Sequence, residues 1–262
     1  SQLVYEFFWN DYCDWYVEGL KLSFKEDEKE KDRATSVYLS ILEEALRLLH
    51  PFLSFITEEL YQKLPISCVQ NFSEEEPCIN PRSEVLAISE YPKYDEKRKD
   101  DDTFKKFSLM QSIVRLIRSL RLDLNIAPSA KSKVYLSLEK NFENIIKNDD
   151  GRLIEMLSRS EYIKIWKEEG KPKNSIGSVG SGFQVFILID GDVKIEDLKS
   201  NFNKRLEAFA KEKKQIEAKL NNKGFVENAP SEVIEKEKNR LFDIEIQSNI
   251  LNSYLEDLDK IV

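Results

Sequence analysis

The C-terminal quarter of the sequence most constrains the fold, because its apolar residues recur every three or four positions over two long segments. This spacing places apolar side chains on one side of an α-helix, so each segment is expected to be a helix that packs against a partner. Between the segments, Gly224 is expected to end the first helix and Pro230 to begin the second. The pattern predicts a long antiparallel α-hairpin, a coiled coil, over residues 193–262. Its expected contact residues are Ile195, Leu198, Phe202, Leu206, Phe209, Ile216 and Leu220 in the first helix and Val233, Leu241, Ile244, Leu251, Leu255, Leu258 and Val262 in the second.

The two predicted helices carry opposite charge. Residues 199–223 contain eight basic and three acidic side chains, whereas residues 231–262 contain four basic and eight acidic ones. At about 100° per residue, four lysines of the first helix fall within one arc, roughly opposite its apolar side. These lysines are Lys204, Lys211, Lys214 and Lys219. Such an arc is either the solvated face of a coiled coil or a surface for the phosphates of a nucleic acid, and the pattern leaves both open.

Residues 129–192 differ in character and predict a small α/β unit. Three short runs are typical of strands, namely SKVYLSL, YIKIW and FQVFILID. Leu153, Met156 and Leu157 predict a helix before the second run. The GSVGSG stretch at 177–182 is expected to be a flexible turn between strands. No Lys-Ser/Thr pair and no helix follow it, so a phosphate-binding loop is not indicated.

Residues 1–128 predict a helical bundle, interrupted by a proline-containing loop at residues 65–100. A long helix is expected from Thr103 to Leu124, with Arg115, Arg118 and Arg121 on its polar side and Lys105 near its start. These basic residues either form salt bridges at the surface or contact nucleic acid, since guanidinium groups suit both. The fold class is therefore mainly α, with a bundle, a small α/β unit and a long α-hairpin.

Seven of the twelve residues from Tyr5 to Tyr16 are aromatic, and no basic residue lies among them. A platform for stacking bases normally combines aromatic side chains with positive charge. We therefore expect these aromatic residues to pack inside the bundle, where each large side chain contributes about 1.5–3 kcal/mol on burial.

Composition excludes several classes of protein. A net charge of −8 makes general attraction to nucleic acid unexpected, so such binding requires local basic surface. Three cysteines without a C-x-x-C pair argue against a disulfide framework or a zinc knuckle. The one histidine, His50, precedes Pro51 and is expected to be a structural hydrogen-bonding residue. We expect no catalytic residue, no metal ligand, no cofactor, no membrane span and no DNA partner in this chain.

Four motifs occur in the order found in bacterial valyl-tRNA synthetases, which the chain resembles from about Val4 to Leu258. They are WNDYCDWYVE, LRLLHPFLSFITEELYQKL, IRSLRLDLNIAPSAK and NKGFVENAPSEVIEKEKNRL. The first three are partly shared with isoleucyl-tRNA synthetases, whereas the last resembles the hairpin tip of the valine enzymes. Departures are small: Tyr61 stands where tryptophan is common, and Leu53-Ser54 stands where Met-Pro is common.

The resemblance implies a C-terminal region with an anticodon-binding bundle (1–128), a small α/β unit (129–192) and a coiled-coil tRNA-binding arm (193–262). It implies tRNA contacts near the anticodon for Lys105, Arg115, Arg118 and Arg121. On the arm it implies contacts for Lys204, Lys211, Lys214 and Lys219, and Phe225 either packs at the tip or stacks on a base of the tRNA elbow.

The resemblance also implies what lies elsewhere. Class I synthetases bind ATP through a His-x-Gly-His sequence, which one histidine cannot provide, so the catalytic and editing domains are absent from this chain. ATP and Mg²⁺ would belong to the parent enzyme, which joins valine to its tRNA in the cytoplasm. Relatives carry earlier bundle helices, so Ser1 is expected to begin part-way through the anticodon-binding domain. The expected partners are valine tRNA and the catalytic domain of the same polypeptide.

Two other interpretations stay open at this point. The chain could be the C-terminal part of an isoleucine- or leucine-type synthetase. It could also be a helical scaffold, without enzymatic role, that binds protein through its α-hairpin.

Overall fold

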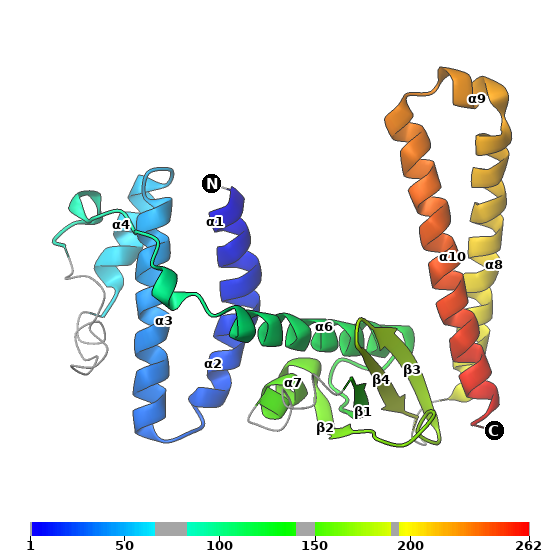
Figure 1. Cartoon of the computed structure of the whole chain (residues 1–262), viewed down its shortest axis with the longest axis horizontal. Coiled ribbons are helices and arrows are strands. Elements are labelled where there is room, and N and C mark those ends of the chain that lie inside the picture. The colour runs from blue at the N-terminus through cyan, green and yellow to red at the C-terminus, as the bar shows by residue number, and fades with distance from the viewer. Residues whose placement is uncertain (1, 66–82, 140–149, 190–193, 262) are drawn as a thin grey trace. The chain divides into compact units, whose positions relative to one another are not determined.

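The computed structural model describes residues 2–65, 83–139, 150–189 and 194–261 (Figure 1). The chain divides into two compact units, Ser1–Asp101 and Asp102–Val262. The first is helical, and the second combines helices with a four-stranded sheet, so the predicted mainly α fold class is confirmed. The predicted division into three parts at residues 128 and 192 stays a prediction. In the described part of the chain, no helix is long and apolar enough to cross a membrane.

The first unit consists of consecutive helices. Asp27 begins the longest of them, because its side chain accepts a hydrogen bond from the Glu30 backbone N–H. That helix ends at Leu49, just before Pro51, as expected. The elements are α1 (Gln2–Glu6), the π-helix η1 (Phe7–Val17), α2 (Glu18–Ser23), α3 (Glu28–Leu49), α4 (Ser54–Lys63), and the short 3₁₀ helices η2 (Leu86–Ile88) and η3 (Glu96–Arg98).

The aromatic stretch packs only in part as expected. Tyr12 is buried; its ring stacks on that of Tyr38 with centroids 5.4 Å apart, and its hydroxyl donates to the Tyr38 carbonyl at 2.9 Å. Trp15 is also buried. Tyr5 and Trp9, however, are more than half exposed, so the prediction that the whole stretch lies inside the bundle is wrong. The i→i+5 hydrogen bonding of η1 widens the turn, and only one side of it meets α3.

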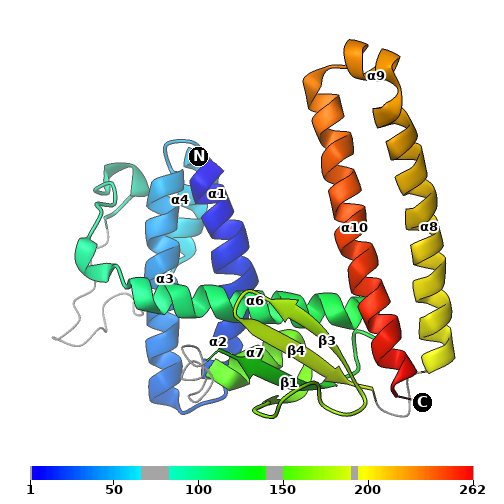
Figure 2. The same cartoon turned by 45° about the vertical axis from the view of Figure 1, so that its right-hand side comes forward.

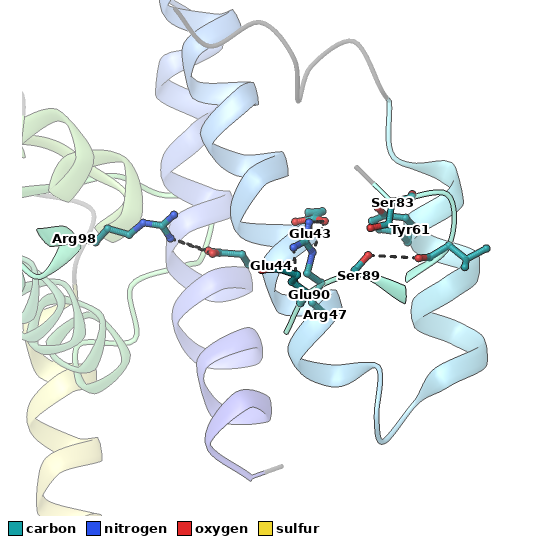
Figure 3. Close-up of polar contacts among 9 residues, drawn as sticks. Glu43, Glu44, Arg47, Tyr61, Ser83, Ser89, Glu90 and Arg98 are labelled. Atoms are coloured by element: carbon teal, nitrogen blue, oxygen red, sulfur yellow. Dashed lines mark hydrogen bonds and ion pairs between the residues drawn. The ribbon is translucent and has the colours of Figure 1, made fainter. Parts of the chain in front are cut away.

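A small apolar cluster of Leu46, Tyr61 and Leu86 joins α3, α4 and η2. Polar contacts surround it (Figure 3). Arg47 is buried and donates to Glu43 at 2.7 Å, and its guanidinium also reaches the Glu90 carbonyl at 3.3 Å. These contacts hold the loop after the α4 region against α3.

The second unit is built around a mixed sheet with strand order β2-β1-β4-β3. β1 pairs parallel with β2 and antiparallel with β4, and β3 pairs antiparallel with β4. A parallel pair needs a long crossover, which here contains α7. The elements are α6 (Asp101–Asp123), β1 (Ser132–Leu138), α7 (Asp150–Ser158), β2 (Ser160–Ile165), β3 (Ser175–Gly180) and β4 (Phe183–Leu188).

The glycine-rich stretch corrects one expectation. Most of it is strand β3, and only Ser181 and Gly182, with φ +81°, form the turn to β4. Gly177 lies opposite Phe186 in the ladder, and a Cβ added there would meet the Phe186 ring at 2.6 Å. The ring covers the glycine, so the apolar surface of this strand comes from its neighbour.

The C-terminal elements form the predicted antiparallel hairpin, which we call the arm (Figures 1 and 2). It comprises α8 (Ile195–Asn221), the short α9 (Lys223–Asn228) and α10 (Ser231–Asp259). Pro230 occupies the N-cap of α10, close to its predicted role. The expected role of Gly224 is wrong, because it lies inside α9, which Asn222 caps by accepting from the Gly224 N–H at 3.0 Å. The buried contact residues are Leu198, Phe202, Ile216, Ile244, Leu251, Tyr254 and Leu258.

Candidate functional site

Ion pairs join the two long helices of the arm on both sides of their apolar contact. Lys213 Nζ lies 2.7 Å from Glu245 and Lys219 Nζ lies 2.6 Å from Glu237. Arg240 donates to both carboxylate oxygens of Glu212, at 2.7 and 2.9 Å. The hydrogen bond from Arg240 lowers the pKa of Glu212, and the one to Glu245 raises the pKa of Lys213. All these groups are therefore charged at neutral pH, and their charges cancel locally.

Three lysines on the outer side of α8 are different. Lys204, Lys211 and Lys214 are exposed, and none of them forms an ion pair with any residue that the structure describes. We call these three residues the lysine edge. At 1.5 Å per residue it extends over about 15 Å of helix. Three positive charges spaced along one straight edge can neutralise successive phosphates of a nucleic acid backbone.

Lys219 was predicted on the same outward arc, and the structure corrects this. It lies about 60° around the helix from Lys204, which brings it to the side of the arm. There its ammonium pairs with Glu237 across the hairpin. A group neutralised in this way gains less from a phosphate, although its predicted contact with tRNA is not tested by this geometry.

Phe225 lies in α9 at the tip of the arm and is half-buried. Its backbone carbonyl accepts from the Ala229 N–H at 2.8 Å, so α9 ends directly after it. The neighbouring Val226 is exposed. The tip therefore presents some apolar surface, and stacking of Phe225 on a base stays a prediction.

Arg121 is a clear correction among the α6 residues. It was expected on an exposed polar side, but it is 6% exposed and donates to the Ala130 and Ala127 carbonyls at 2.7 and 3.2 Å. It also donates to the Ser132 hydroxyl and the Arg159 carbonyl. Burial, with Arg159 nearby, lowers the pKa of Arg121. This guanidinium fastens the end of α6 to β1 and offers little surface to RNA.

The other three basic residues of α6 divide in the same way. Arg118 donates twice to the Leu157 carbonyl, at 2.9 and 2.7 Å, so it ties α6 to α7. Lys105 and Arg115 are exposed, and Arg115 borders an open groove of about 410 Å³ between α6 and the β3–β4 turn. Of the four predicted residues, these two keep the surface position that contact with tRNA requires.

The outer side of α10 carries a feature that the sequence analysis missed. Phe242, Ile246 and Ile250 are exposed and follow one another at four-residue spacing. We call these residues the apolar edge. About 160° separates them from the buried side of α10, so the lysine edge and the apolar edge face away from each other. Their spacing in the sequence was the available signal.

Metal chemistry finds no support in the described part of the chain. No group of three or more His, Cys, Asp and Glu side chains that could hold a metal occurs there. His50 lies with Nδ1 2.8 Å from the Thr57 hydroxyl, so its expected role in hydrogen bonding is confirmed. Cys13 is a free thiol, and Cys68 and Cys78 lie outside the described residues.

Comparison with known protein families agrees with this arrangement. The family described as "Anticodon-binding domain of tRNA ligase" matches residues 1–136, more than half of the chain. A second family, "Valyl tRNA synthetase tRNA binding arm", matches residues 194–259, which are the arm. The chain therefore belongs to the family of tRNA ligases that carry this anticodon-binding domain.

Individual relatives narrow this class to one kind of ligase. The chain is similar to valine–tRNA ligases of Treponema denticola (46% identical, 98% of this chain and 28% of the relative), Aquifex aeolicus (32%, 91% and 20%) and Thermotoga maritima (31%, 99% and 27%). It corresponds to the C-terminal part of a valyl-tRNA synthetase, as the resemblance implied. The chain spans about a quarter of the length of these relatives.

Proposed function

We propose that this chain is the part of a valine–tRNA ligase that grips tRNA. The bundle would hold the anticodon side, and the arm would brace the elbow, so that the acceptor end reaches a catalytic domain of the same polypeptide. That domain would join valine to the tRNA in the cytoplasm with ATP and Mg²⁺. The residues of this chain would bind and orient the RNA and would take no part in the chemistry.

The lysine edge is the observation that carries this proposal. The other cations between the two helices are neutralised by the acidic residues of α10, which leaves Lys204, Lys211 and Lys214 to face solvent. Folded RNA is bound largely through its phosphates and its shape, which suits a rigid rod with charge on one side. Lys105 and Arg115 on α6 are the remaining candidates for contacts near the anticodon.

Titration of a valine tRNA transcript into the chain at two salt concentrations tests the proposal. We expect binding that weakens as salt rises, because each neutralised phosphate releases counterions. A leucine tRNA transcript is the matched control for specificity. Absence of binding at low salt, or an affinity independent of salt, would contradict the proposal.

A protein-binding scaffold is a second candidate, and the apolar edge of α10 favours it. Exposed aromatic and aliphatic side chains in a row are typical of surfaces that meet another helix. Exchange of Phe242 and Ile246 for serine separates the two functions. Unchanged affinity for tRNA supports the RNA-binding function of the lysine edge.

A further inference from the structure

Asp257, near the end of α10, is a buried carboxylate with three donors. Its residue is 4% exposed. Lys171 Nζ lies 2.8 and 2.7 Å from its two oxygens, and the Gly177 backbone N–H points to one of them at 3.4 Å. Lys171 belongs to the loop between β2 and β3, and Gly177 belongs to β3. One side chain therefore joins the base of the arm to the sheet at two places.

The position of this acid is unfavourable for the helix itself. The last turn of a helix carries a partial negative charge, so acidic residues there cost stability and basic residues add it. The last turn of α10 contains no basic residue, and Glu256, Asp257 and Asp259 all lie in it. A local rule broken in this way indicates that the carboxylate serves something other than the stability of its own helix.

The loop that supplies Lys171 is shaped for that contact. Gly170, directly before it, has φ +82°, and its carbonyl accepts from the Trp166 indole at 2.9 Å. Beyond Lys171, the Pro172 carbonyl accepts from the Ser175 hydroxyl at 2.6 Å. The backbone on both sides of Lys171 is thus held, and the ammonium group is directed at α10.

Buried ion pairs add little net stability, because removing both charges from water costs about as much as their attraction returns. Their better supported use is to select one geometry among several similar ones. Tyr254 and Phe202, with ring centroids 5.7 Å apart, already supply apolar contact at the base of the arm. The pair of Asp257 with Lys171 adds direction to that contact.

We propose that Asp257 is a positioning residue for tRNA recognition: it fixes the angle at which the arm leaves the sheet and so places the lysine edge. The inference rests on the proposed tRNA-binding function. α10 has 29 residues and is about 43 Å long, so a tilt of about 10° at its base moves the tip by about 7 Å. The same tilt moves Lys204 by about 2 Å and Lys214 by about 5 Å. Since a phosphate contact requires about 3 Å between heavy atoms, the outer lysines would lose theirs.

The test combines the geometry of the arm with the affinity for tRNA in one variant, Asp257→Asn. Asparagine keeps the shape but removes the charge, and its amide group would meet the ammonium of Lys171 as a second donor. Spin labels at exposed positions 161 on β2 and 221 on α8, in a chain whose three cysteines are serine, report the distance between sheet and tip. Asp243→Asn, on the exposed side of the same helix, makes the same charge change and is the control.

We expect the distance distribution to broaden by several ångströms in Asp257→Asn and the affinity for valine tRNA to fall about tenfold, the order of one lost phosphate contact. Asp243→Asn should change neither. A broad distribution with unchanged affinity, or a narrow one with reduced affinity, would overturn the positioning role. If the unsubstituted chain does not bind tRNA, the proposed function fails, and this is seen separately. If Asp257→Asn does not fold, Lys171→Gln breaks the same pair from its exposed partner and is judged by the same outcomes.

Discussion

Neutralising the lysine edge should reduce both the affinity for tRNA and its dependence on salt. The perturbation is the triple exchange of Lys204, Lys211 and Lys214 for glutamine. With the duplex value of about 0.9 counterion per contact, each lysine that meets a phosphate contributes about 1.2 kcal/mol in 0.1 M salt. If all three do so, the variant loses about 3.7 kcal/mol, or about 500-fold in affinity. The slope of log K against log salt should become shallower by about 2.7.

The assay is fluorescence anisotropy of a labelled valine tRNA transcript between about 50 and 200 mM salt. The matched control is the exchange of Lys199, Lys213 and Arg240 for glutamine, which removes the same charge from residues paired with Asp259, Glu245 and Glu212. Because these charges are already neutralised, the control should lose less than about fivefold. Equal losses in the two triple variants would refute the argument, because net charge and not the lysine edge would then set the affinity. Circular dichroism of both variants excludes unfolding of the arm.

Three further predictions concern the second unit. Arg121→Met should lower the free energy of unfolding in urea by about 3 kcal/mol, because four acceptors lose their buried donor, whereas Lys105→Met should change it by less than about 0.5 kcal/mol. Gly177→Ala should lower the same free energy by about 1–3 kcal/mol through the clash of its Cβ with the Phe186 ring, and an unchanged value would contradict the packing described. Burial raises the pKa of Tyr254 to about 12, so the folded state holds this proton more tightly than the unfolded state, whose pKa is about 10. Stability is therefore present below pH 10 and should fall by about 2–3 kcal/mol between pH 10 and 12, measured as urea unfolding, and Tyr254→Phe should lack this loss.

The arm was predictable because its information is local. Apolar residues at spacings of three and four define one side of each helix, and Pro230 marks the start of the second helix without reference to any distant residue. The lysine edge followed from the same periodicity. Lys219 differed because its neighbour Glu237 lies on the other helix, and the register between the two helices cannot be derived from either one alone.

The missed features all depend on residues far apart in the sequence. Strand β3 looks like a turn because glycine and serine dominate it, and the ring that covers Gly177 belongs to β4. Arg121 lies among polar residues in the sequence, yet its acceptors come from β1 and from the residues around Arg159. Asp257 and Lys171 are 86 residues apart, and no periodicity connects them.

Photocrosslinking from the arm tests the central claim most directly. A benzophenone side chain at position 211, on the lysine edge, is compared with one at position 242, on the apolar edge of α10. With valine tRNA bound, we predict crosslinks from position 211 to the loops that form the tRNA elbow, and none from position 242. Crosslinks only from position 242, or from position 211 only to the anticodon end of the tRNA, would contradict the account.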